Sequence, residues 1–164
     1  HFVATNTRSA ARFVGVEGSV RAAYKRFSGK LAGSVQYEFD KPGTTVFEPP
    51  PITRLFPTFQ LYANAGVAIP ELRLQVTVLG RVIGARGASE SNQRLNTLSF
   101  YQLPPWGDFD VVVSTRGLRW MGEETTISLA AKNLLNVSHP EPGFGGFDVP
   151  NIGRTLMLEL RQTF

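Results

Sequence analysis

The sequence predicts an all-β fold, an antiparallel segment of a transmembrane β-barrel with about seven strands. The main observation is a period-two alternation of apolar and polar residues. It is clearest at the end of the chain, where Leu156, Leu158 and Leu160 share one parity and Glu159 and Arg161 the other. Successive side chains of a strand point to opposite faces, so one face is apolar and the other polar. In addition, 16 glycines and 11 prolines gather between the alternating segments, which favours strands and turns over helices.

The alternation recurs in seven segments. They span residues 13–24, 29–39, 55–67, 72–83, 108–120, 125–133 and 153–164. Before the last segment, the apolar parity holds Val14, Val16, Val20, Leu31, Val35, Tyr37, Phe59, Leu61, Val67, Leu74, Val76, Val78, Phe109, Val111, Val113, Ile127 and Leu129. The polar parity holds Glu17, Arg21, Lys30, Gln36, Gln60, Asn64, Arg73, Gln75, Arg81, Asp110, Ser114, Ser128 and Lys132. The last segment has the length of a membrane-crossing strand, roughly 9–11 residues. Residues 1–5 are interpreted as the end of an eighth strand.

The connections between the segments alternate between short and long. The short ones lie near residues 25–27, 69–71 and 121–124, and the long ones span residues 40–54, 85–107 and 136–152. Tight turns at one end and large loops at the other are typical of outer-membrane barrels, with the turns on the periplasmic side. A soluble meander has no reason to gather its long loops at one end.

The polar face has two interpretations. It is the solvated face of a soluble sheet, or it is the lumen of a wide barrel whose apolar face meets lipid. In lipid every backbone amide and carbonyl needs a partner inside the protein, so a spanning sheet must close on itself. An odd number of strands leaves two open edges. We therefore expect the chain to be one segment of a larger barrel, or to close with another chain.

Composition excludes several other classes. No run approaches the roughly 18 apolar residues of a spanning helix. The net charge of +4 is modest and the basic residues are scattered, so nucleic acid is not an expected partner. The absence of cysteine excludes disulfides and thiolate metal sites. The chain begins at His1 without a Met or a leader, so we expect either a removed leader or a piece of something longer.

No catalytic constellation is evident, and the expectation is a protein that is not an enzyme. The only histidines are His1 and His139, too few for a multi-histidine metal site, and no cofactor or metal is expected. The Gly-rich run Gly143-Phe144-Gly145-Gly146 does not open a helix after a strand, so it does not predict a phosphate loop.

Four stretches together resemble the C-terminal part of the β-barrel of TonB-dependent outer-membrane receptors. They are Asn6 followed by Gly15-Val16-Glu17; residues 31–39 followed by a loop and Pro57; Asn133-Leu134-Leu135-Asn136; and Gly153-Arg154 with the terminal Phe164. The resemblance covers almost the whole chain in the family's order. It departs at Leu135, where the family has an aromatic residue, and at Gln162, where it has a large apolar one.

The resemblance implies one portion, residues 1–164, of a barrel of about 22 strands in the bacterial cell outer membrane. The plug domain, the TonB-contacting segment and the N-terminal barrel strands would be missing from this portion. The implied role is structural, within a receptor that takes up scarce nutrients such as iron chelates, cobalamin or glycans. The implied partners are the remaining barrel strands or another chain that completes the barrel, the lipid bilayer, and TonB through the missing parts. The alternative is a soluble or small-barrel β protein that binds a ligand or a protein partner through its long loops.

Three groups of residues are the predicted sites. The barrel-assembly signal, implied by the resemblance, comprises Phe164, Leu160 and Leu158; the alternative is an aromatic end of a soluble sheet. Two interfacial aromatic girdles comprise Tyr24, Phe27 and Trp120 near the turns, and Tyr37, Phe39, Phe59 and Phe109 near the loops; the alternative is core packing. Candidate outer-loop contacts are Phe47, Tyr101, Trp106, Phe144 and Phe147; the alternative is plain loop packing.

Overall fold

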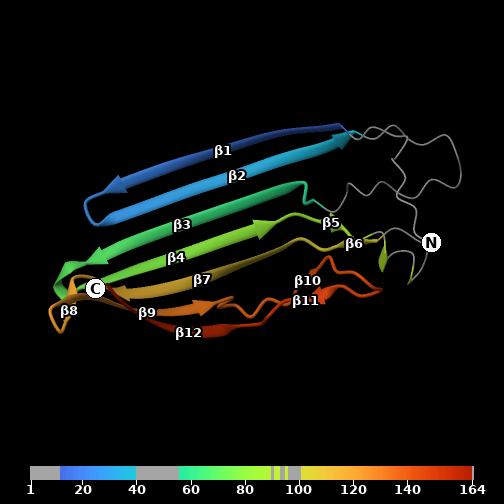
Figure 1. The fold of residues 1–164 in the computed structure, drawn as a ribbon. Helices are drawn as coiled ribbons and strands as arrows, with labels where there is room; N and C mark the ends of the chain where they lie inside the picture. Colours follow the sequence, from blue (N-terminus) through green and yellow to red (C-terminus); the bar gives the residue numbers. More distant parts are fainter. Residues whose placement is uncertain (1–11, 40–55, 90, 93–94, 96–100, 164) are drawn as a thin grey trace, which may run out of the picture.

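The fold is one curved antiparallel sheet, an open half-barrel, as the sequence predicts. The computed structural model describes residues 12–39, 56–89, 91, 92, 95 and 101–163. The long strands are β1 (Arg12–Tyr24), β2 (Phe27–Phe39), β3 (Phe59–Ile69), β4 (Leu74–Ile83), β7 (Trp106–Thr115), β9 (Glu123–Lys132) and β12 (Thr155–Gln162). They lie side by side in chain order, so β1 and β12 are the edges of the described sheet (Figure 1).

The short and long connections separate to opposite ends of the sheet, as predicted (Figure 1). The turns are residues 25–26, the 3-10 turn η2 (Pro70–Leu72) with Arg73, and a segment that contains β8 (Leu118–Trp120). Two of the long connections carry small strand pairs of their own. These are β5 (Arg86–Gly87) with β6 (Gln102–Leu103), and β10 (Pro140–Glu141) with β11 (Val149–Pro150).

Of the strand boundaries that differ from the prediction, three have identifiable reasons. Strand β3 begins at Phe59 rather than at residue 55, beyond Pro57, which lacks a backbone N–H for the ladder. Strand β4 begins after Arg73, whose φ of 53° is left-handed and ends the preceding turn. The predicted segment 108–120 is two strands, β7 and β8, because the backbone turns at Gly117, where φ is +62°.

The break between β7 and β8 is a bulge opposite β9. Ser114 faces Ser128 and Leu118 faces Thr125. The chain of β7 and β8 therefore advances four residues where β9 advances three, so the bulge holds one extra residue. The hydroxyl of Thr115 accepts the backbone N–H of Ile127 at 2.9 Å and so replaces a ladder bond. The bulge keeps β9 paired beyond the end of β7.

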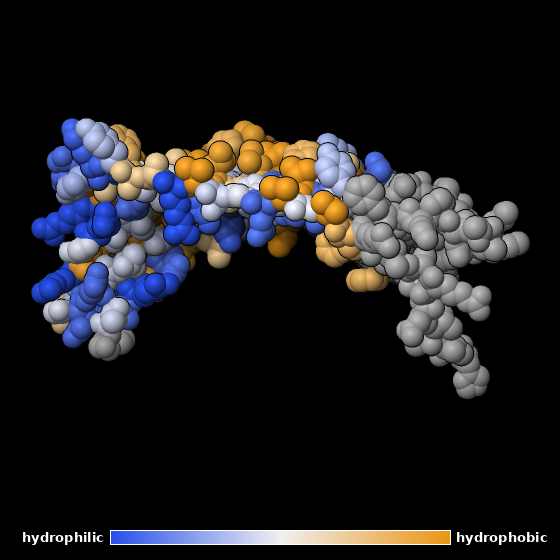
Figure 2. All heavy atoms as spheres, turned by 90° about the horizontal axis from the view of Figure 1, so that it is seen from above, coloured by the Kyte–Doolittle hydropathy of each residue, from blue (hydrophilic) through white to orange (hydrophobic). Residues whose placement is uncertain are grey.

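The register joins the apolar rows of neighbouring strands into one continuous face. Aligned pairs include Val20↔Leu31, Leu61↔Val82, Val78↔Val111 and Leu158↔Leu129. These side chains are exposed or half-buried, and in the described residues the buried apolar side chains are Pro57, Ile83, Ala88 and Leu103. Figure 2 shows hydrophobic residues along the middle of the sheet and hydrophilic ones at the end with the short turns. The sheet therefore has no apolar core of its own to bury this face.

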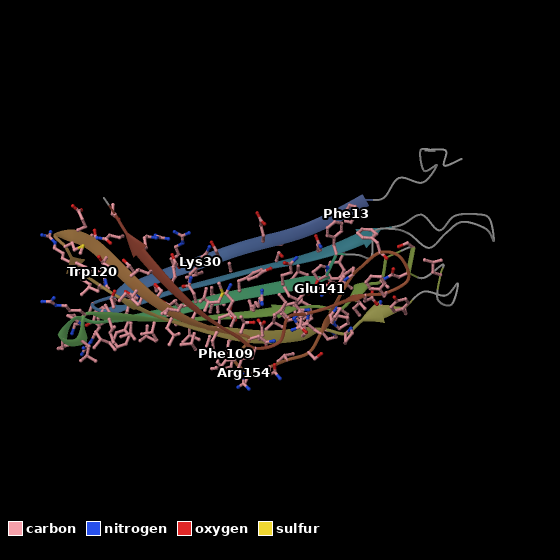
Figure 3. All side chains as sticks on the ribbon, turned by 60° about the horizontal axis from the view of Figure 1, so that its bottom comes forward. Phe13, Lys30, Phe109, Trp120, Glu141 and Arg154 are labelled. Atoms are coloured by element: carbon pink, nitrogen blue, oxygen red, sulfur yellow. The ribbon has the colours of Figure 1, made fainter. Side chains whose placement is uncertain are left out.

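The sheet is bent into a trough, with the apolar rows on its convex side. In Figure 3, Phe109 and Arg154 point away from the trough, whereas Lys30 and Glu141 lie on its inner side. The concave side carries the polar rows, for example Tyr62, Arg81 and Asp108 on three successive strands. Among the described residues, no helical segment has the length and apolar composition needed to cross a membrane.

Candidate functional site: a polar cavity inside the half-barrel

A cavity of about 670 Å³ lies on the concave side, at the end of the sheet with the long connections. We call it the inner cavity. Strands β3, β4, β7, β9 and β12 provide its floor through the polar parity of each strand, and the connection between β9 and β12 provides His139, Glu141 and Asn151. Its position follows from the alternation, which directs these strand residues away from the apolar side.

A two-bond ion pair between Arg81 and Asp108 forms one wall of the inner cavity. The register places the two residues directly opposite each other on β4 and β7. Nε of Arg81 donates to Oδ1 of Asp108 at 2.7 Å, and Nη2 donates to Oδ2 at 2.8 Å. The side chain of Asp108 is 1% exposed and that of Arg81 is 45% exposed. Such a planar, bidentate pair fixes orientation as well as charge.

The indole of Trp106 is held between the sheet and the loop after β9. The His139 ring stacks on it with a centroid separation of 3.6 Å and an interplanar angle of 5°. The Arg81 guanidinium carbon lies over the same indole, 5.2 Å from its centroid, at cation–π distance. Since Arg81 also binds Asp108, a single network joins β4, β7 and the loop.

His139, Glu141 and Arg86 extend this network. Arg86 Nη1 lies 2.8 Å from Glu141 Oε2, and Arg86 Nη2 donates to the carbonyl of Pro140 at 3.1 Å. His139 Nδ1 lies 3.2 Å from Glu141 Oε1 without the alignment of a hydrogen bond. Burial lowers the pKa of His139 below its ordinary 6.5, with Glu141 and Asp108 opposing this shift. The imidazole is therefore favoured in its neutral form.

Two long connections are bound to each other by Asn92. This side chain is fully buried; its Nδ2 donates to the carbonyl of Phe147 at 2.7 Å and to Asp148 Oδ1 at 2.9 Å. Its Oδ1 accepts the N–H of Gly146 at 3.0 Å. The hydroxyl of Tyr101 donates to Asp148 Oδ2 at 2.9 Å. These bonds hold the connection before β7 against the connection after β9, over the end of the sheet.

The run Asn133-Leu134-Leu135-Asn136 has a structural role that the sequence pattern did not reveal. Asn133 and Asn136 have left-handed φ values of 49° and 55°, a conformation that asparagine tolerates well. Asn133 Nδ2 donates to the carbonyl of Val137, and its Oδ1 accepts the Val137 N–H. Asn136 Oδ1 accepts the N–H of Arg154 at 2.9 Å. The two amides therefore set where the chain leaves β9 and where it enters β12.

The three groups of predicted site residues occupy different places. Of the assembly signal, Leu158 and Leu160 are 76% and 58% exposed on the convex side of edge strand β12, and Phe164 lies outside the described residues. The roles of this group stay predictions.

Most of the girdle residues lie near strand ends, whereas Phe109 is the fourth residue of β7. Tyr24 and Phe27 face each other across the β1–β2 turn, and both are exposed, as are Trp120, Tyr37 and Phe59. Phe109 is half-buried, and the side chain of Phe39 lies outside the described residues. Contact of these rings with a membrane interface stays a prediction.

The candidate loop contacts divide into two kinds. Phe144 and Phe147 are 79% and 63% exposed. Trp106 belongs to β7 rather than to the preceding loop, and its ring packs in the inner cavity; Tyr101 binds Asp148. Phe47 lies outside the described residues.

The inner cavity is lined by ionised, amide and aromatic side chains. Its ionised groups are mostly paired with each other, except for Lys132, which makes no ion pair within the described part of the chain. Among the described residues, no group of three or more histidine, cysteine or carboxylate side chains could hold a metal ion.

One solved structure has the same fold over nearly all of this chain. The pyoverdine outer membrane receptor FpvA from Pseudomonas aeruginosa, solved bound to pyoverdine, aligns with a TM-score of 0.70 at 16% identity. The alignment covers 94% of this chain and 22% of the receptor, so the chain spans about a fifth of the receptor's length. No protein-family model matches the sequence, and neither does any curated protein. The half-barrel therefore has the fold of one part of an outer-membrane receptor barrel.

Proposed function

We propose that this chain forms part of the wall of a TonB-dependent receptor barrel in the bacterial outer membrane. The observation that carries the proposal is the continuous apolar convex face on a sheet without an apolar core. In water such a face would leave a large contiguous apolar area exposed, which soluble monomers avoid. In a bilayer the same face meets hydrocarbon, and the polar concave side lines the interior of the barrel.

The two open edges support the same proposal. Strand β1 pairs only with β2, and β12 pairs with β9 alone of the described strands. Open edges are not tolerated in lipid, because unpaired backbone groups cost several kcal/mol each. The partners of this chain are therefore the polypeptide that supplies the remaining strands and, through parts beyond this sheet, the TonB system that powers uptake.

The inner cavity gives this wall a role in uptake. It faces the interior at the end of the sheet with the long loops, which is the outer end in this class of barrel. A polar cavity that contains Lys132, a cation without an ion-pair partner among the described residues, suits a polar or anionic solute better than an apolar one. The transported classes that the resemblance implies are iron chelates, cobalamin or glycans.

The test uses the complete absence of cysteine from the chain, which makes single-cysteine probes specific. Phe144→Cys places a thiol on a long loop, and Met121→Cys places one at a short turn; both native side chains are strongly exposed, at 79% and 83%. A membrane-impermeant maleimide added to intact cells should label the first and not the second. After the outer membrane is permeabilised, both should react.

The soluble alternative predicts a different result. A soluble β protein would leave the envelope without detergent, and both thiols would react equally in any compartment that the maleimide reaches. Recovery of the chain in the soluble fraction, or labelling of Met121→Cys from outside, would contradict the proposed wall.

A further inference from the structure

The apolar convex side of the sheet contains a hollow of about 280 Å³ near the end with the long connections. We call it the outer hollow. Leu61, Val82 and Phe109 border it on β3, β4 and β7, and Leu135 borders it from the connection after β9. Arg81 and Asp108 contribute to the border as well, but their side chains pair with each other on the concave side. The side chains that face the outer hollow are therefore apolar.

The outer hollow exists because Gly80 has no side chain. The register places Gly80 between Ala63 on β3 and Phe109 on β7, within the convex rows. Outside the neighbouring residues of the chain, the nearest atom to a Cβ atom at Gly80 would be the backbone oxygen of Asp108, at 4.0 Å. Close packing within the sheet therefore does not require a glycine at this position. Glycine inside a strand often marks a place where a ligand approaches the backbone closely.

A cation lies beside the outer hollow on the same side of the sheet. Arg154 immediately precedes β12 and continues the convex row that begins with Leu156. In Figure 3 it points away from the trough, as Phe109 does. The side chain of Arg154 is exposed, and within the described residues its guanidinium has no hydrogen-bond or ion-pair partner. A cation that faces lipid is costly unless it has an anionic partner.

The connection after β9 fixes the cation relative to the outer hollow. The N–H of Leu134 donates to the carbonyl of Phe109 at 2.9 Å, and the N–H of Arg154 donates to Oδ1 of Asn136 at 2.9 Å. Leu135, which is 62% exposed, lies between these two bonds. Strands β7 and β12 are two strand spacings apart, which is roughly 10 Å. A single lipid molecule spans this separation.

We propose that the outer hollow and Arg154 bind one anionic membrane lipid, with an acyl chain in the hollow and the headgroup phosphate on Arg154. This rests on the proposed function, because it requires the convex side to face a bilayer. The apolar border suits hydrocarbon, and the planar guanidinium can donate two hydrogen bonds to one phosphate. An arginine at the end of a strand can extend its charged group to the level of the headgroups. The lipid belongs to the leaflet on the side of the long connections.

Quenching of an introduced tryptophan by brominated lipids tests the site in the assembled barrel. Leu135→Trp places an indole at the border of the outer hollow, and Leu158→Trp places one on the same convex side, four residues from Arg154. The barrel is reconstituted in vesicles of dioleoyl phosphatidylcholine that contain a rising fraction of dibrominated phosphatidylcholine or dibrominated phosphatidylglycerol. The signal of the protein without the introduced tryptophan is subtracted. Phosphatidylglycerol should bind about fivefold better than phosphatidylcholine next to Leu135→Trp, the gain expected from one cation at a membrane surface, and about equally well next to Leu158→Trp.

Two pairs of variants, each combined with Leu135→Trp, separate this site from a general attraction to charge. Arg154→Gln should remove the preference for phosphatidylglycerol, and Arg154→Lys should keep most of it. Gly80→Leu fills the outer hollow and leaves Arg154 in place, so it should also reduce the preference, whereas Gly80→Ala should keep it. The gel shift between folded and heated protein confirms that each variant folds. A preference that survives Arg154→Gln, or one that Gly80→Leu leaves unchanged, would overturn the inference.

The two proposals fail in different ways. If both brominated lipids quench Leu158→Trp but do not differ at Leu135→Trp, the barrel wall stands and the lipid site is wrong. Protection of Leu135→Trp from both lipids, as a second copy of the chain packed on the outer hollow would produce, also contradicts the lipid site. If neither lipid quenches Leu158→Trp, the convex side does not meet the bilayer and the proposed function fails first.

Discussion

Three consecutive valines in β7 allow the assignment of the two faces to be tested with one residue type. Val111 and Val113 lie in the apolar rows, opposite Val78 and Val76, whereas Val112 lies on the concave side opposite Thr77. All three are half-buried. Val111→Arg and Val112→Arg therefore lose the same side chain and gain the same charge. The difference between their stabilities shows which of the two side chains faces the lipid.

The expected magnitude follows from depth in the bilayer. Val111 is four residues from the turn end of β7, which is about 9 Å along the membrane normal for a strand tilted by roughly 45°. This lies well inside an apolar band about 25 Å tall, where an arginine costs about 2–4 kcal/mol. Val111→Arg should thus lower the folded-to-unfolded ratio by roughly 30-fold or more. Val112→Arg, next to the small side chains of Thr77 and Ala130, should cost less than about 1 kcal/mol.

The assay is urea unfolding of the assembled barrel in lipid vesicles, followed by tryptophan fluorescence and by the gel shift between folded and heated protein. The valine-to-alanine variants at both positions correct for lost packing. A Val112→Arg variant that is as unstable as Val111→Arg would refute the assignment of faces, and so would Val111→Arg with wild-type stability.

Three further predictions concern the inner cavity and its loops. Asp108→Ala should destabilise the folded barrel by about 1–3 kcal/mol in urea unfolding, because it leaves Arg81 without its bidentate partner. The 45% exposure of the Arg81 side chain limits this loss. The control variant Lys132→Gln breaks no ion pair among the described residues and should change stability by less than about 0.5 kcal/mol. The lowered pKa of His139 means that the folded state binds the proton more weakly than the unfolded state. Stability should therefore be full above pH 6.5 and should fall as the pH drops through the lower pKa of the folded state. Urea midpoints measured across this range should lose their pH dependence in His139→Gln. Asn92→Ala should remove the bonds between the two long connections and speed their cleavage in limited proteolysis, whereas an unchanged cleavage rate would show that Asn92 does not hold them together.

The strands could be predicted from sequence because their signal is local. Period two requires only neighbouring residues, and it placed the β1, β2 and β12 rows on the correct parity. The alternation of short and long connections needs only the positions of the strands, so it was recovered as well. The bulge after Thr115 was missed, although the apolar residues shift there from odd positions in β7 to even ones, Leu118 and Trp120, as the backbone turns at Gly117.

The inner cavity could not be predicted, because its contacts join distant parts of the chain. Trp106 meets His139 only after β9 has brought the following loop back over the sheet. A single histidine followed by Pro140 carries no local sign of stacking. Asn92 similarly resembles any loop asparagine until its partners, 54 to 56 residues away, are in place. The run from Asn133 to Asn136 was recognised only as part of the resemblance, and its two left-handed residues were not predicted.

The geometry of the loop aromatics indicates how ligand contact and rigidity are divided. Trp106 already has an imidazole stacked on it and a guanidinium over its ring, so a ligand would have to displace one of them before it could stack there. The hydroxyl of Tyr101 likewise donates a hydrogen bond to Asp148. The rings of Phe144 and Phe147 are 79% and 63% exposed, and neither stacks on another ring within the part of the chain that the structure describes. In the proposed uptake role, the contacts of Trp106 and Tyr101 stiffen the loops, which lowers the ordering cost of binding, and Phe144 and Phe147 stay the predicted ligand contacts.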